Sequence, residues 1–165
     1  MNPAIQDAAL VASVGIGATI VMDLWLALLK RLGMPGLNMA FIGRWAGHIL
    51  RNRWRHDAIA RSAPIPGEAA LGWLVHYGVG VAFAGLLAVA AGMAWMRDPS
   101  PWPAIALGIV SVVAPLFVLQ PAMGAGFASS RTPTPIKNCL RSLANHAVFG
   151  AGLYAAAMLV KSITQ

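Results

Sequence analysis

Residues 69–96 read AALGWLVHYGVGVAFAGLLAVAAGMAWM and contain no Asp, Glu, Lys or Arg. A helix of about 20 predominantly apolar residues is long enough to cross a bilayer, and this stretch exceeds that length. Three further stretches, residues 8–29, 102–128 and 140–160, are similarly apolar. We therefore predict an all-α integral membrane protein, a bundle of four transmembrane helices.

The composition supports a membrane protein rather than a soluble one. The chain has 165 residues, of which 58 % are hydrophobic and 10 % are charged, whereas about a quarter of the residues of a soluble domain are charged. This length indicates one transmembrane domain, residues 1–165. Its only cysteine, Cys139, excludes an internal disulfide and a CxxC metal motif.

The positive charge is distributed very unevenly. The formal net charge is +7, and ten of the twelve Lys and Arg residues lie in or beside two connections, residues 30–68 and 129–139. Short loops rich in Lys and Arg stay in the cytoplasm, which predicts that both termini are periplasmic. Because these charges lie between apolar spans, they suit the bilayer and its anionic headgroups, and we expect no nucleic acid partner.

The first connection contains a predicted amphipathic helix that begins after Asn38. Its apolar face carries Met39, Ile42, Trp45, Ala46 and Ile49, and its polar face carries Arg44, His48, Arg51 and Arg55. Such a helix lies in the cytoplasmic interface against anionic lipid or, alternatively, caps the bundle. We expect lipid headgroups or other anions to contact Arg44, Arg51, Arg53, Arg55 and Arg131.

Three spans each contain an ionisable side chain on a stripe of small residues. These side chains are Asp23, His76 and His146. Stripes of small residues let helices approach closely, so the polar groups should point inward. At 1.5 Å per residue, all three lie roughly 8 to 13 Å from the predicted cytoplasmic ends of their spans. We predict a polar intramembrane site that also includes Asn145, Tyr77 and Gln120.

The predicted site has several interpretations. In the first, its side chains form hydrogen bonds that hold the helices together. In the second, they form a transport site for a proton, cation or small solute beside a third span that is interrupted by Pro and Gly. A third interpretation is haem or metal ligation by His76, His146 and Asp23 in a membrane oxidoreductase component. A fourth is a scaffold or assembly protein whose Arg-rich connection recruits a partner. Transport is the leading hypothesis.

Two further expectations follow from the sequence. Conventional enzyme motifs, such as G-x-S-x-G or a P-loop, are absent from the chain, which favours a protein that is not an enzyme. Four helices make a thin pore, so the small-residue faces also favour a homodimer.

Several segments together resemble a known family. They are Met22-Asp-Leu-Trp25, Gly43-Arg-Trp-Ala-Gly-His48, Gly67-Glu68, Gly72-Trp-Leu-Val-His-Tyr77, Gln120-Pro-Ala-Met-Gly124 and Asn145-His-Ala-Val-Phe-Gly150. The chain resembles an uncharacterised, domain-of-unknown-function family of small bacterial inner-membrane proteins. The resemblance covers nearly the whole length, and it implies a four-helix architecture and an inner-membrane location. It implies no activity.

Overall fold

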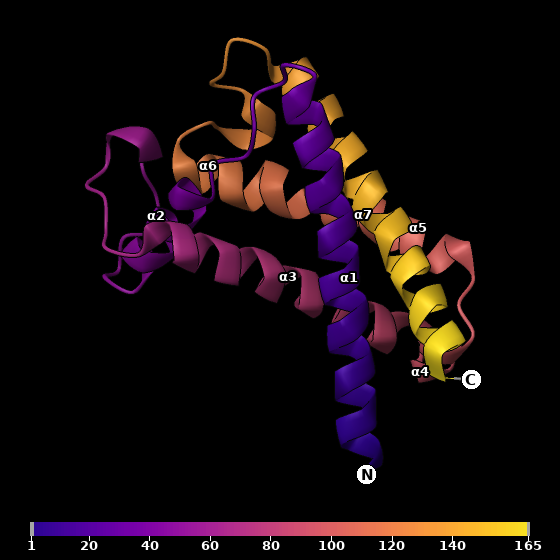
Figure 1. The fold of residues 1–165 in the computed structure, drawn as a ribbon. Coiled ribbons are helices and arrows are strands. Elements are labelled where there is room, and N and C mark those ends of the chain that lie inside the picture. The colour runs from indigo at the N-terminus through magenta and orange to yellow at the C-terminus, as the bar shows by residue number, and fades with distance from the viewer. Residues whose placement is uncertain (1, 165) are drawn as a thin grey trace. The chain divides into compact units, whose positions relative to one another are not determined.

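The computed structural model describes residues 2–164, and four long helices dominate it (Figure 1). They are α1 (Pro3–Arg31), α3 (Glu68–Ala91), a third helix over Pro101–Met123 and α7 (Pro135–Thr164). Each is long and apolar enough to cross a membrane. The predicted all-α architecture with four membrane-spanning helices is confirmed.

The chain forms two compact units. The first unit comprises Met1–Pro35, Tyr77–Ser111 and Asn145–Gln165, and the second unit comprises Gly36–His76 and Val112–Ala144. The boundaries fall inside three of the long helices, so each unit contains pieces that are far apart in sequence.

Close contacts between small residues hold the first unit together. A Cβ atom on Gly15 of α1 would lie 2.5 Å from the Cα of Val81 in α3, and one on Gly108 would lie 2.4 Å from the Cα of Gly150 in α7. In Figure 1, α1 and α7 run side by side, and Gly152 packs against Ala18 between them. The small stripes therefore face neighbouring helices, as predicted.

The third helix changes its geometry along its length. It begins as α5 (Pro101–Ser111), continues as a π-helical segment, η2 (Ala114–Leu119), and ends as α6 (Gln120–Met123). Pro115 has no N–H to donate, and the Gln120 N–H bonds to the Pro115 carbonyl five residues earlier. We expected the helix to reach residue 128, but Gly124 ends it with a left-handed φ of 97°. A short 3₁₀ turn, η3 (Phe127–Ser129), follows.

The second apolar stretch is also interrupted. Gly92 has a φ of 84°, which ends α3 at Ala91, and a separate helix α4 (Met93–Arg97) follows in the first unit. The sequence predicted one span over residues 69–96. A glycine in this left-handed conformation breaks the helix at no steric cost, and an apolar sequence gives no sign of it.

The predicted helix in the first connection is α2 (Met39–Ile49), in the second unit. The Asn38 side chain accepts a hydrogen bond of 3.0 Å from the Ala40 N–H, which confirms the predicted cap. A Cβ atom on Gly43 would lie 1.8 Å from the Glu68 carbonyl oxygen, so α2 touches the first turn of α3. A 3₁₀ turn, η1 (Ile59–Arg61), lies between the two helices in sequence.

Candidate functional site

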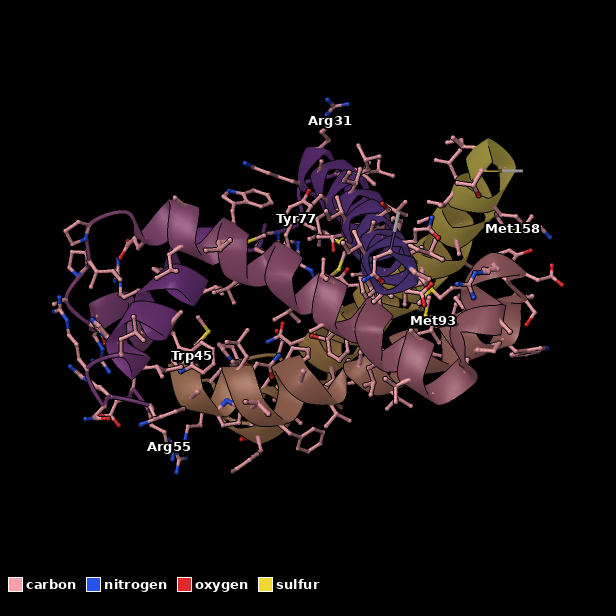
Figure 2. The ribbon with its side chains drawn as sticks, turned by 90° about the horizontal axis from the view of Figure 1, so that it is seen from below. Arg31, Trp45, Arg55, Tyr77, Met93 and Met158 are labelled. Atoms are coloured by element: carbon pink, nitrogen blue, oxygen red, sulfur yellow. The ribbon has the colours of Figure 1, made fainter. Side chains whose placement is uncertain are left out.

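The first unit brings Asp23 of α1 together with Tyr77 of α3. The Tyr77 hydroxyl donates a hydrogen bond of 2.9 Å to Oδ2 of Asp23, and both side chains are half-buried. Tyr77 lies between the ribbons of α3 and α1 in Figure 2. A carboxylate in an apolar helix needs such a partner, because an unpaired charge is costly there.

A second hydrogen bond joins α1 to α7. Nε1 of Trp25 donates to Oδ1 of Asn145 over 3.0 Å. Trp25 lies two residues after Asp23, and Asn145 directly precedes His146. The bond therefore connects the part of α1 that contains the carboxylate with the part of α7 that contains the imidazole.

A third contact joins α5 to α7 through Ser111 and His146. Oγ of Ser111 lies 2.7 Å from Nδ1 of His146 and donates to the Gly108 carbonyl oxygen over 2.6 Å. A hydroxyl has one hydrogen to donate, so the Ser111 oxygen accepts from a protonated Nδ1. In the neutral imidazole, Nε2 then carries the lone pair, which is the atom that can accept a proton.

These three contacts form one set, which we call the polar network: Asp23, Trp25, Tyr77, Ser111, Asn145 and His146. The sequence predicted four of its members and missed the parts played by Trp25 and Ser111. Trp25 lies near the end of the apolar stretch 8–29, where tryptophan commonly marks the bilayer interface, and serine is one of the small residues common where helices pack. The ability of both side chains to form hydrogen bonds is the feature of the sequence that could have identified them as members of the network.

The two other predicted site residues belong to the second unit. The ring of His76 makes an edge contact with Trp73, with the ring centroids 5.9 Å apart. Oε1 of Gln120 accepts a hydrogen bond of 2.9 Å from Oγ of Ser129. Within residues 2–164, no group of three or more His, Cys, Asp or Glu side chains is placed to hold a metal ion.

An ion pair of Arg44 and Glu68 connects α2 to α3 in the second unit. Nε and Nη2 of Arg44 donate to the two carboxylate oxygens of Glu68 over 2.9 and 2.7 Å. Nη1 of Arg44 donates to the carbonyl oxygens of Ile59 and Ser62. The hydrogen bonds to Glu68 raise the pKa of the guanidinium above its usual value. Arg44, for which we predicted a headgroup or anion contact, is only 8 % exposed and is used in bonds within the second unit.

His48, one turn after Arg44 on α2, pairs with His56 of the loop that follows the helix. Nδ1 of His48 lies 2.8 Å from Nε2 of His56, and both rings are buried. Burial lowers the pKa of the His56 imidazole, although the Ala122 carbonyl opposes this shift. Nδ1 of His56 is buried without a hydrogen-bond partner. The predicted polar face of α2 therefore points into the protein at Arg44 and His48.

The remaining predicted arginines lie outside helices. The sequence predicted that Arg51 and Arg55 lie on the polar face of α2. Because this helix ends at Ile49, they are not part of it. Arg51, Arg53, Arg55 and Arg131 are all exposed. Figure 2 shows Arg55 pointing away from the ribbon of the second unit.

Comparison with known families matches residues 12–160 to a family described as Protein of unknown function (DUF2938). The chain belongs to this family. The matched region includes the polar network and the Arg44–Glu68 pair, and the family's description assigns neither of them a role. No curated protein and no solved structure matches the chain.

Proposed function

We propose that this member of the family conducts a proton or a small cation through the polar network of its first unit. The observation that carries the proposal is the pairing of Asp23 with Tyr77 and of His146 with Ser111 between helices that are otherwise apolar. Ionisable residues within transmembrane segments are rare, and ion and proton pathways are among the functions that they mark.

The chemistry of the two pairs supports proton transfer. The carboxylate of Asp23 accepts protons, and the Tyr77 hydroxyl is both a donor and an acceptor. His146 presents a lone pair on Nε2 when Nδ1 donates to Ser111, and an imidazole can accept a proton there. The Trp25–Asn145 bond holds the neighbouring parts of α1 and α7 in register.

Hydrogen bonding between helices is the structural alternative. Side-chain hydrogen bonds within membranes contribute about 0.6 kcal/mol each on average. Two neutral contacts of the Trp25–Asn145 kind would serve that purpose without a carboxylate, whose presence in an apolar helix is expensive. The proposal therefore depends on Asp23 and His146 rather than on the network as a whole.

We place the protein in a bacterial inner membrane with both termini periplasmic. Ten of its twelve Lys and Arg residues lie in or beside the two connections, residues 30–68 and 129–139. The positive-inside rule assigns such connections to the cytoplasm.

Purified protein reconstituted into vesicles tests the proposal. An imposed pH gradient and separate Na⁺ and K⁺ gradients should give a flux above that of protein-free vesicles for at least one cation. His146→Asn keeps an N–H near the position of Nδ1 and removes Nε2, so it should retain the fold and lose most of the flux. Wild-type protein without flux for any of the three cations would overturn the proposal.

A further inference from the structure

The segment from Leu50 to Arg55, sequence LRNRWR, exposes both cationic and apolar side chains in the second unit. Leu50 is 85 % exposed and Trp54 is 60 % exposed, and all three arginines of the segment are exposed. We call residues 50–55 the arginine segment.

Hydrogen bonds hold the backbone of the arginine segment in place. The Arg53 N–H donates to the His48 carbonyl over 3.0 Å, and Nε1 of Trp45 donates to the Trp54 carbonyl over 3.0 Å. Directly after the segment, the His56 N–H donates to the Ala122 carbonyl over 2.8 Å. Asn52 has a φ of 59°, which turns the chain as it leaves α2. The segment is therefore ordered before it meets a ligand.

The positive charge of the segment is not neutralised within the described chain. In residues 2–164, no acidic side chain forms an ion pair with Arg51, Arg53 or Arg55. Arg44, only a few residues earlier, binds both oxygens of Glu68. The contrast shows that the second unit uses one arginine for its own structure and presents three outward.

We propose that the arginine segment binds the headgroup of an anionic phospholipid. Guanidinium groups bind phosphate oxygens in a bidentate manner, and clusters of Lys and Arg beside a transmembrane helix attract anionic lipid. The exposed Trp54 and Leu50 decide between lipid and other anions. Tryptophan settles at the level of the headgroups, and an exposed leucine suits the adjacent acyl chains, whereas a soluble anion uses neither.

A lipid titration of the purified protein in detergent tests this proposal. Fluorescent phosphatidylglycerol is compared with phosphatidylcholine of the same chain length. Each arginine near an anionic surface contributes about a fivefold change in affinity. The combined variant Arg51→Gln, Arg53→Gln, Arg55→Gln should therefore bind phosphatidylglycerol about 100-fold more weakly, and its affinity for phosphatidylcholine should not change.

Three comparisons control the experiment. Lys30→Gln, Arg31→Gln, Lys137→Gln removes the same charge from other exposed sites and should retain most of the affinity. The corresponding triple Arg→Lys variant keeps the charge and should lose only part of the affinity. Trp54→Ala should weaken phosphatidylglycerol binding without any change in charge.

Three results would overturn the proposal. The first is equal affinity of the wild type for the two lipids. The second is an equal loss in the control triple variant, which would make the effect one of net charge. The third is full displacement of phosphatidylglycerol by excess inorganic phosphate with no effect of Trp54→Ala, which would assign the segment to a soluble anion.

Discussion

The Tyr77 hydroxyl donates a hydrogen bond of 2.9 Å to Oδ2 of Asp23 and so joins α3 to α1 through the only acidic side chain in the apolar stretch of residues 8–29. Close packing supports the bond. Gly80, one turn after Tyr77, lies against Thr19, one turn before Asp23. Small residues on both helices therefore bring the phenol and the carboxylate within reach of each other.

Tyr77→Phe should destabilise the protein by about 1 kcal/mol, because the substitution removes the hydrogen bond from Tyr77 to Oδ2 of Asp23 in an apolar setting. It should also reduce the cation flux. Tyr154→Phe is the matched control, since Tyr154 is a half-buried tyrosine of the same unit that makes no hydrogen bond through its hydroxyl within residues 2–164. Thermal unfolding in detergent measures the stabilities. Equal losses of stability and flux in the two variants would show that the Tyr77 hydroxyl contributes no more than the Tyr154 hydroxyl.

Gly108→Ala should separate α5 from α7. The added Cβ would lie 2.4 Å from the Cα of Gly150 and 2.6 Å from the His146 carbonyl oxygen, both backbone atoms that cannot rotate away. We expect a loss of about 1–3 kcal/mol, the usual cost of overpacking. Gly78→Ala is the control, because a Cβ there meets nothing within 4 Å. It should be neutral or stabilising, since alanine favours a helix by about 0.5–1 kcal/mol over glycine.

Arg44→Lys should destabilise the second unit by about 1–3 kcal/mol, because an ammonium group keeps the charge but cannot replace both the bidentate bond to Glu68 and the bonds to two carbonyl oxygens. Arg97→Lys is the control. Arg97 forms an ion pair with Asp7 that is largely exposed, and such pairs contribute about 0–1 kcal/mol. Unfolding in denaturant compares the two. Similar small losses would show that the Arg44 pair is as weak as a surface pair.

The stability of the second unit should fall as the pH falls below about 6.5. Burial lowers the pKa of His56 below its usual value of 6.5, so the unfolded chain takes up a proton before the folded chain does. The contribution of neutral His56 to the stability of the second unit is complete above pH 6.5. It is lost as the pH falls through the pKa of His56 in the folded state. His48, Arg53 and Asp57 act electrostatically on this ring, and Nδ1 of His48 lies 2.8 Å from it.

Hydrogen exchange of residues 50–66 at pH 7.5 and pH 5.0 measures this effect locally. Protection factors, which correct for the slower intrinsic exchange at low pH, are compared, and those of the wild type should be smaller at pH 5.0, because a proton taken up by the buried His56 ring carries a desolvation cost. His56→Gln should give the same protection factors at both pH values. A wild type whose protection factors in this segment are insensitive to pH would contradict the prediction.

Much of this structure could be predicted from the sequence, because hydropathy and small-residue spacing report directly on helices. The four helices, the Asn38 cap and the contacts of Gly15 and Gly108 all follow from such patterns. Asp23, Tyr77, Asn145 and His146 were identified because polar groups in apolar helices are rare.

The rest depends on partners that a periodic pattern does not specify. The sequence pattern of α2 predicts that Arg44 lies on the polar face of the helix. The pattern is the same whether that arginine is exposed to solvent or buried against Glu68, so it does not predict the ion pair. The bond between His48 and His56 depends on how the loop after α2 folds back. The left-handed conformation of Gly92 likewise depends on the tertiary structure, since glycine is also common within transmembrane helices.

The most direct test of the central claim is the cation flux of Asp23→Asn compared with that of Asp7→Asn in vesicles with matched amounts of inserted protein. Both changes replace one carboxylate of α1 by an amide, but Asp7 pairs with Arg97 at the start of the helix and lies outside the polar network. We predict that Asp23→Asn abolishes the flux and that Asp7→Asn retains it. Equal flux in the two variants would contradict the account and leave Asp23 as a contact that only stabilises the helices.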